Sequence, residues 1–144
     1  MAFTGNFMCT SFKVEILKAV HNFTNSTGNT FRCAMYTNSA TFTAATTAYT
    51  ASNEVTGTAY VAKGNTLVNV TPTSTSTTAF TDFSDTTWSS STITARGAMI
   101  YNDSATGDPS VVILDFGSDK SSSSGDFTIV FPTGDSTSAI IRIA

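Results

Sequence analysis

The stretch between residues 88 and 132 constrains the fold of this chain more than any other. It holds three apolar runs, at 93–101, 111–116 and 127–131, that are rich in β-branched and aromatic residues. Loops of Asn, Asp, Ser, Gly and Pro separate them, and these residues are typical of turns. We therefore expect three consecutive antiparallel strands, a β-meander.

The middle run of the three has no polar face. Residues 111–114 read Val-Val-Ile-Leu, whereas a strand with one face in water alternates apolar and polar residues. We therefore expect this strand to be covered on both faces, either inside a sandwich or under a neighbouring subunit.

The chain of 144 residues is long enough for a single domain with its own core. Only 12% of its residues are charged and the formal net charge is −3, with no basic run or Arg-aromatic patch. This composition argues against a nucleic-acid partner. No apolar run approaches the roughly 20 residues that span a bilayer, so we expect no membrane partner. A charge-poor surface rich in Ser and Thr suits a protein inside an assembly, and equally suits a β-protein with no such role.

The first eight residues form a short apolar arm that contains Phe3, Phe7 and Met8. The arm lacks the basic and apolar segments of an export signal, so we expect the chain to be made in the cytoplasm. Such an arm is either disordered or docked on another surface.

Residues 10–23 have the pattern of an amphipathic helix. Phe12, Ile16 and Val20 recur every four residues and form one apolar stripe. The polar, Gly-containing segment at 22–29 ends the helix. One such helix beside a sheet covers part of the sheet or closes an open end.

The rest of the chain, residues 30–144, reads as strands and loops. Besides the meander, we expect strands at 30–36, 60–62, 66–70, 79–83 and 138–144, with a turn at 72–78. This count predicts a mainly β fold: a single-domain antiparallel β-sandwich of jelly-roll type, or a small barrel, with one N-terminal helix.

The polar tract at 37–59 has few core candidates, among them Phe42 and Tyr49. A compact domain rarely carries so long a stretch without regular structure unless the stretch has a function. We therefore predict a functional or interface loop there.

His21 is the only histidine, and no sequence motif supplies it with a nucleophile or an orienting partner. We expect a histidine that lies on the surface or interacts with the helix dipole near the helix end, no catalytic residues and no cofactor. The chain is therefore not expected to be an enzyme.

The two cysteines, Cys9 and Cys33, form neither a disulfide framework nor a zinc site. We expect buried thiols, with a bridge between them as the alternative. Most acidic residues flank predicted turns, where Asp bonds to its own backbone; a calcium site between loops is the alternative, but we predict no metal.

Arg96 lies in the middle of an apolar run, where a charge either points outward or pairs with a carboxylate, and Asp115 on the next strand is a reasonable partner. Trp88 is expected in the core or at its rim. With the tyrosines it could instead form a sugar-stacking platform.

Five segments carry a resemblance to a known group of proteins. They read MCTSFKVEILKAVHNF, FRCAMYTNSA, TAYTASNEVTGTAY, TARGAMIYND and VVILDFGSDKSSSSGDFTIVFP. They are spread from residue 8 to residue 132, and they resemble small virion structural proteins of tailed bacteriophages; the resemblance covers nearly the whole chain.

The resemblance implies a capsid decoration (cement) protein with a jelly-roll fold. Such proteins form homotrimers that bind the major capsid protein between capsomers and stabilise the shell. We expect partner contacts through the arm, at Phe3, Phe7 and Met8, and through the long loop, at Phe42 and Tyr49. A tail- or fibre-associated virion protein and a carbohydrate-binding module on the virion surface are the alternatives.

Overall fold

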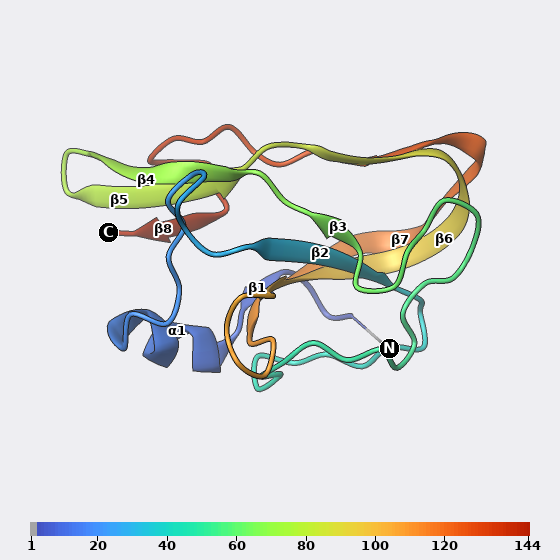
Figure 1. The fold of residues 1–144 in the computed structure, drawn as a ribbon, viewed down its shortest axis with the longest axis horizontal. Helices are drawn as coiled ribbons and strands as arrows, with labels where there is room; N and C mark the ends of the chain where they lie inside the picture. Colours follow the sequence, from blue (N-terminus) through green and yellow to red (C-terminus); the bar gives the residue numbers. More distant parts are fainter. Residues whose placement is uncertain (1–2) are drawn as a thin grey trace.

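The computed structural model describes residues 3–144. Their elements are β1 (Phe7–Met8), α1 (Thr10–Leu17), β2 (Phe31–Tyr36), β3 (Asn65–Thr66), β4 (Asn69–Thr75), β5 (Thr78–Phe83), β6 (Thr86–Asn102), β7 (Ser110–Ile129) and β8 (Ile141–Ile143). The larger sheet has the strand order β1-β7-β6-β2-β3 and the smaller sheet the order β4-β5-β8 (Figure 1). The fold is mainly β with two antiparallel sheets and one short helix, as predicted, and is consistent with a β-sandwich. Jelly-roll connectivity stays a prediction.

One long hairpin, β6 and β7, takes the place of the predicted meander. The prediction of three strands is wrong because the Ser-rich segment that follows Phe116 does not turn the chain. It continues β7 and pairs with β6, with Lys120 opposite Ala95. Serine and threonine hydroxyls bond across the pair, as between Thr94 and Ser121 at 2.8 Å. These cross-strand bonds let a polar segment complete a ladder that a loop would have interrupted.

The hairpin is bent by several β-bulges. The largest lies where β6 has one residue, Arg96, and β7 has four, residues 116–119. Further register shifts lie close to Ser90 and Ser124, which have positive φ angles of 52° and 49°. Bulges bend a strand and increase its twist. The far end of the hairpin accordingly curves round and returns toward the smaller sheet, which gives β7 a concave side (Figure 1).

A single core joins the two sheets. Stacked and tilted aromatic rings run from Phe23, through Phe31 on β2, to Phe83 on β5, with centroid separations of 4.3 Å and 5.6 Å. The apolar start of β7 is also buried: Val111 and Ile113 lie on one face and Val112 on the other, whereas Leu114 is half-buried. The prediction that this segment is covered on both faces is confirmed for residues 111–113, and the covering residues belong to the same chain.

The helix is shorter than predicted and weakly amphipathic. It ends at Leu17, and Ala19 adopts a left-handed conformation with φ 57°. Phe12 is its buried residue, whereas Leu17 is 87% exposed. The chain leaves the helix early because His21 and Phe23 are buried against the core, which a continued helix would not permit.

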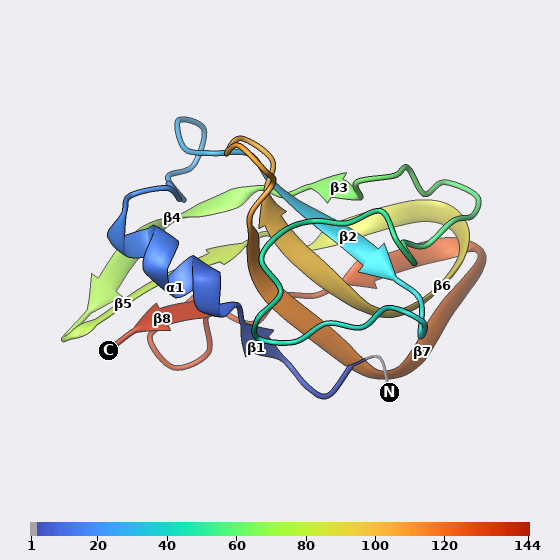
Figure 2. The same cartoon turned by 90° about the horizontal axis from the view of Figure 1, so that it is seen from below.

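The helix lies beside the smaller sheet, near the C-terminal end of the chain (Figure 2). Ile16 faces Phe80, Ile141 and Ile143 across a narrow apolar gap of about 110 Å³. No helix within residues 3–144 is long and apolar enough to cross a membrane.

The remaining strands follow the sequence prediction in part. Residues 60–62 belong to a loop, and residues 72–75 extend β4 where a turn was predicted. Pro72 is tolerated because β4 is an edge strand with a register shift beside this residue. The tract at 37–59 is a long loop with isolated bridges, as predicted.

Candidate interaction groove

A continuous groove runs along the concave side of β7. One part, of about 450 Å³, is lined by Phe116, Lys120 and residues 126–130. The adjoining part, of about 490 Å³, lies between β1, β7 and the chain at 129–132 and 138–140. Because the two parts share Phe116, Ile129 and Val130, we treat them as one surface and call it the β7 groove.

The outer edge of β7 is open beside this groove. β1 pairs only with Val112 and Ile113, and the Asn6 side chain accepts a hydrogen bond from the Asp115 N–H at 2.6 Å. From residue 116 to residue 129, β7 has backbone partners only on β6 within the described part of the chain. An open strand edge is a template for pairing with another chain.

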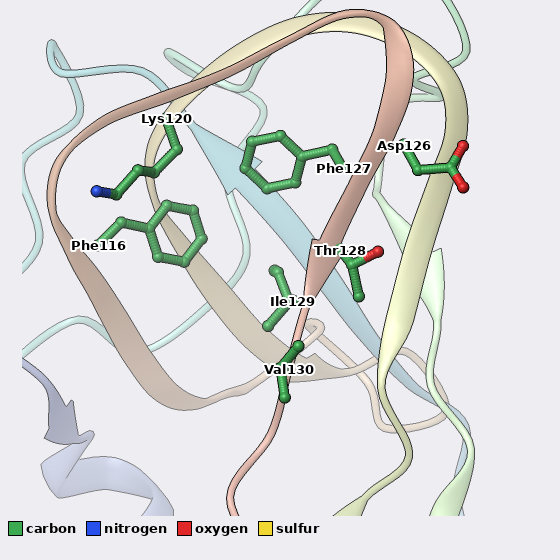
Figure 3. Close-up of a pocket in the computed structure, with 7 residues that line it drawn as sticks. All are labelled: Phe116, Lys120, Asp126, Phe127, Thr128, Ile129 and Val130. Carbon is green, nitrogen blue, oxygen red and sulfur yellow. The ribbon is translucent and has the colours of Figure 1, made fainter.

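The groove combines an apolar floor with three charged residues, Lys120, Asp115 and Asp126. Phe116 and Phe127 pack 6.2 Å apart between ring centroids, and Val130 is 72% exposed at the groove's end. Phe116, Lys120 and Phe127 point into the space enclosed by the bend of β7, whereas Asp126 points away (Figure 3). Lys120 is exposed and has no carboxylate within ion-pair distance in residues 3–144.

An ion pair between Arg96 and Asp115 holds the bulge that begins the groove, which confirms the predicted pairing. Both side chains are 11% exposed. The Asp115 carboxylate also accepts a hydrogen bond from the Gly117 N–H at 2.8 Å. Burial raises the pKa of Asp115, but the Gly117 N–H and the Arg96 guanidinium outweigh it and lower the pKa below its ordinary value.

The structure places the five predicted contact residues in different environments. Phe7 and Met8 line the β7 groove and are half-buried. Phe3 and Phe42 are buried against each other, with centroids 5.7 Å apart, so their rings belong to the chain's own core. The arm is docked on β7 through β1, and its first two residues lie outside the described part.

Tyr49 lies away from the groove, in a network that fastens the long loop. Its hydroxyl donates a hydrogen bond of 2.6 Å to Glu54, and its ring stacks on Tyr101 at 4.7 Å. Glu54 also accepts bonds from the Tyr60 hydroxyl and the Lys63 N–H, both at 2.7 Å. Burial and the bond to Glu54 raise the pKa values of Tyr49 and Tyr60. These contacts give Tyr49 a structural role within the chain.

His21 is buried, so the expectation of a surface histidine is wrong. The extended chain after α1 carries its ring inward, where Nε2 lies 2.9 Å from a Glu15 oxygen and Nδ1 lies 3.1 Å from the Asn102 amide nitrogen. Because an amide nitrogen only donates, Nδ1 accepts and Nε2–H donates to Glu15. Within the described residues no hydroxyl or thiol bonds to this ring, so the arrangement holds the chain after α1 in place.

Trp88 is 2% exposed and stacks on Tyr60 at 6.0 Å, so it cannot form the surface platform that sugar stacking requires.

Several carboxylates bond to turn backbone as predicted; Asp135, for example, accepts from the N–H groups of Thr137 and Ser138. Both cysteines are buried free thiols. No group of three or more metal-ligating side chains occurs in the described part of the chain.

The sequence does not single out Phe116, Lys120 and Val130 as surface candidates. Phe116 and Val130 fall inside predicted strands of the meander, where burial is the expectation. The signal available was the Ser-rich segment between them, which contains no Pro and can therefore continue a strand.

Comparison of the chain with protein-family models, with curated proteins and with solved structures finds no match to any of them.

Proposed function

We propose that this protein is a non-enzymatic structural component of a tailed-bacteriophage virion. Its first candidate role is that of a capsid decoration protein, which stabilises the shell by binding the major capsid protein between capsomers. The observation that supports a binding role most directly is the open β7 edge beside an apolar groove. The phage assignment itself depends on the resemblance of the five sequence segments.

A charge-poor β-domain is suited to such a binding role. A protein with few surface charges binds through shape, apolar anchors and backbone edges. If it binds only the assembled shell, it stabilises the assembled state by mass action. No chemical step is needed for that activity.

The proposal is tested on particles. The protein should be found by mass spectrometry in purified virions of the phage that encodes it, and it should co-sediment with capsids that lack it. A reconstruction of the particle by electron cryo-microscopy should show density for it over the whole shell. Density at one vertex only would assign it to the tail, and absence from purified particles would overturn the proposal.

A further inference from the structure

We propose that the β7 groove takes an extended segment of another protein, which adds to the edge of β7 as an antiparallel strand between Lys120 and Ile129. The segment presents apolar side chains at alternate positions to the groove and places a carboxylate beside Lys120. This inference rests on the proposed function, because it specifies how a shell partner is held.

The backbone of β7 provides the first part of the argument. The edge that follows the bulge at 116–119 is uncovered, and β7 contains no proline that would remove a donor. A β-bulge close to Ser124, which has φ 49°, bends this edge once, so an added strand must follow the same bend. The open length, from Lys120 to Ile129, matches an ordinary strand. Antiparallel pairing is the more stable arrangement, and all strands of this fold pair in that way.

The side chains of the floor provide the second part. Phe127 and Ile129 lie two residues apart on one face of β7, and both line the groove. A strand added to the edge continues this face, so its residues at alternate positions lie beside the same apolar floor. The exposed Val130 extends that floor at the groove's end.

The charged side chains around the groove indicate which charge a bound segment would carry. Arg96 on the paired strand β6 is already paired with Asp115, whereas Lys120 points into the groove without a carboxylate partner within residues 3–144 (Figure 3). Asp126 lines the groove, but its carboxylate is directed away from the enclosed space and accepts a hydrogen bond from the Ser90 N–H at 3.0 Å. The groove therefore favours a segment that carries an acidic side chain.

The same criterion argues against a second copy of this chain as the occupant. The strands at the ends of the two sheets are β1, β3, β4 and β8. None of the four contains an acidic residue, and β8 carries Arg142, which would repel Lys120. The homotrimer implied by the resemblance would need a contact elsewhere on the surface.

A synthetic strand tests the inference without knowledge of the natural partner. The probe is a fluorescein-labelled peptide of about eight residues in which valine and threonine alternate and aspartate stands at the carboxyl end. Bound antiparallel to β7, this end lies at Lys120. We expect saturable binding in fluorescence anisotropy, and binding at least about tenfold weaker when alternate backbone nitrogens are methylated, since each lost hydrogen bond contributes on the order of 1 kcal/mol.

Charge reversal tests the position of the carboxylate. Lys120→Glu should weaken binding about two- to fivefold, as expected of an exposed ion pair, and a peptide with lysine in place of aspartate should recover that loss. Lys18→Glu is the matched control, because Lys18 is an exposed cation outside the groove. A second variant, Val130→Ser, changes an exposed side chain of the floor and should also weaken binding. Unchanged thermal unfolding would show that each variant is folded.

The outcomes separate the two proposals. Equal binding of the methylated peptide, or no effect of Lys120→Glu on either peptide, would overturn the strand-addition inference. Concentration-dependent self-association that is abolished by Val130→Ser would assign the groove to a second copy of this chain. That result would also overturn the strand-addition inference. Capsid co-sedimentation that is unaffected by Lys120→Glu and Val130→Ser would leave the proposed function standing while removing this mode of binding. Peptide binding without capsid binding would leave the strand-addition inference standing and count against the proposed function.

Discussion

At the scale of single residues, buried polar groups bonded to several elements determine where the chain can go. Asn102 is fully buried at the end of β6, and its amide nitrogen bonds to His21 Nδ1 and to Asn29 Oδ1, both at 3.1 Å. Its side-chain oxygen accepts from the Ser104 N–H at 3.0 Å. One side chain thus links the segment after α1, the next loop and the β6–β7 turn.

We expect Asn102→Ala to lower the free energy of unfolding by about 2–4 kcal/mol, because it leaves several buried polar groups without a partner. Denaturant unfolding followed by circular dichroism measures the change. Asn38→Ala, at an exposed loop position, is the control and should stay within about 0.5 kcal/mol of wild type. A loss of similar size at both positions would contradict the network role.

The Arg96–Asp115 pair gives a pH-dependent prediction. Since its partners lower the pKa of Asp115 in the folded state, the pair contributes stability above the ordinary pKa of 3.8, and this stability is lost as pH falls through the lowered value. Arg96→Met should cost about 1–3 kcal/mol at neutral pH and progressively less in acid, because a protonated Asp115 no longer needs the cation. Urea unfolding at several pH values in the acid range measures the loss in free energy of unfolding, with the exposed variant Arg142→Met as the control. A loss that does not change with pH would show that packing, and not charge, is responsible.

At the scale of elements, two glycines in a left-handed conformation shape the chain: Gly64 beside β2, and Gly117 inside the β7 bulge. Gly64 has φ +71° and its missing Cβ would collide with the backbone of Cys33 on β2, whereas Gly117 has φ +78° in the β7 bulge with open space around it. Both positions carry the same backbone preference, but only one is packed against a neighbour.

Gly117→Ala should therefore cost only the strain of a left-handed alanine, about 1–2 kcal/mol. Gly64→Ala should cost clearly more, because β2 must move as well. Thermal unfolding of the two variants measures the difference. Equal losses would mean that the loop before β3 can shift away from β2 freely.

At the scale of the whole molecule, the two thiols report on the integrity of the core. Cys9 and Cys33 are fully buried, on opposite sides of α1 in the sequence. Burial raises the pKa of both thiols, that of Cys33 to about 12. Each is therefore shielded from solvent and held in the unreactive protonated form.

We expect neither thiol to react with a disulfide reagent such as dithiobisnitrobenzoate in the native protein at neutral pH, and both to react at the rate of global unfolding in denaturant. Absorbance of the released thiolate measures the rate. Fast reaction of one thiol under native conditions would show that its part of the fold opens locally.

Much of the architecture could be predicted from local pattern alone. The alternation that begins at Phe31 marked β2, the run that ends at Phe83 marked β5, and the polar tract at 37–59 marked a loop. The Arg96–Asp115 pair could be predicted because a charge in an apolar strand needs a partner on its neighbour. These features depend on residues near in sequence or on one strand pairing.

Tertiary structure alone decided the features that depend on competition between distant segments. The helix stops at Leu17 because burying His21 and Phe23 against the core is more favourable in free energy than forming further helical turns. Phe3 and Phe42 became core residues because they meet each other, not because of their own surroundings in sequence. The Ser-rich segment after Phe116 became strand because β6 offered hydroxyl partners and a continuous ladder, and the resulting bend created the β7 groove. Local pattern records what a segment can form, whereas burial and pairing with remote segments select which of those forms is lowest in free energy.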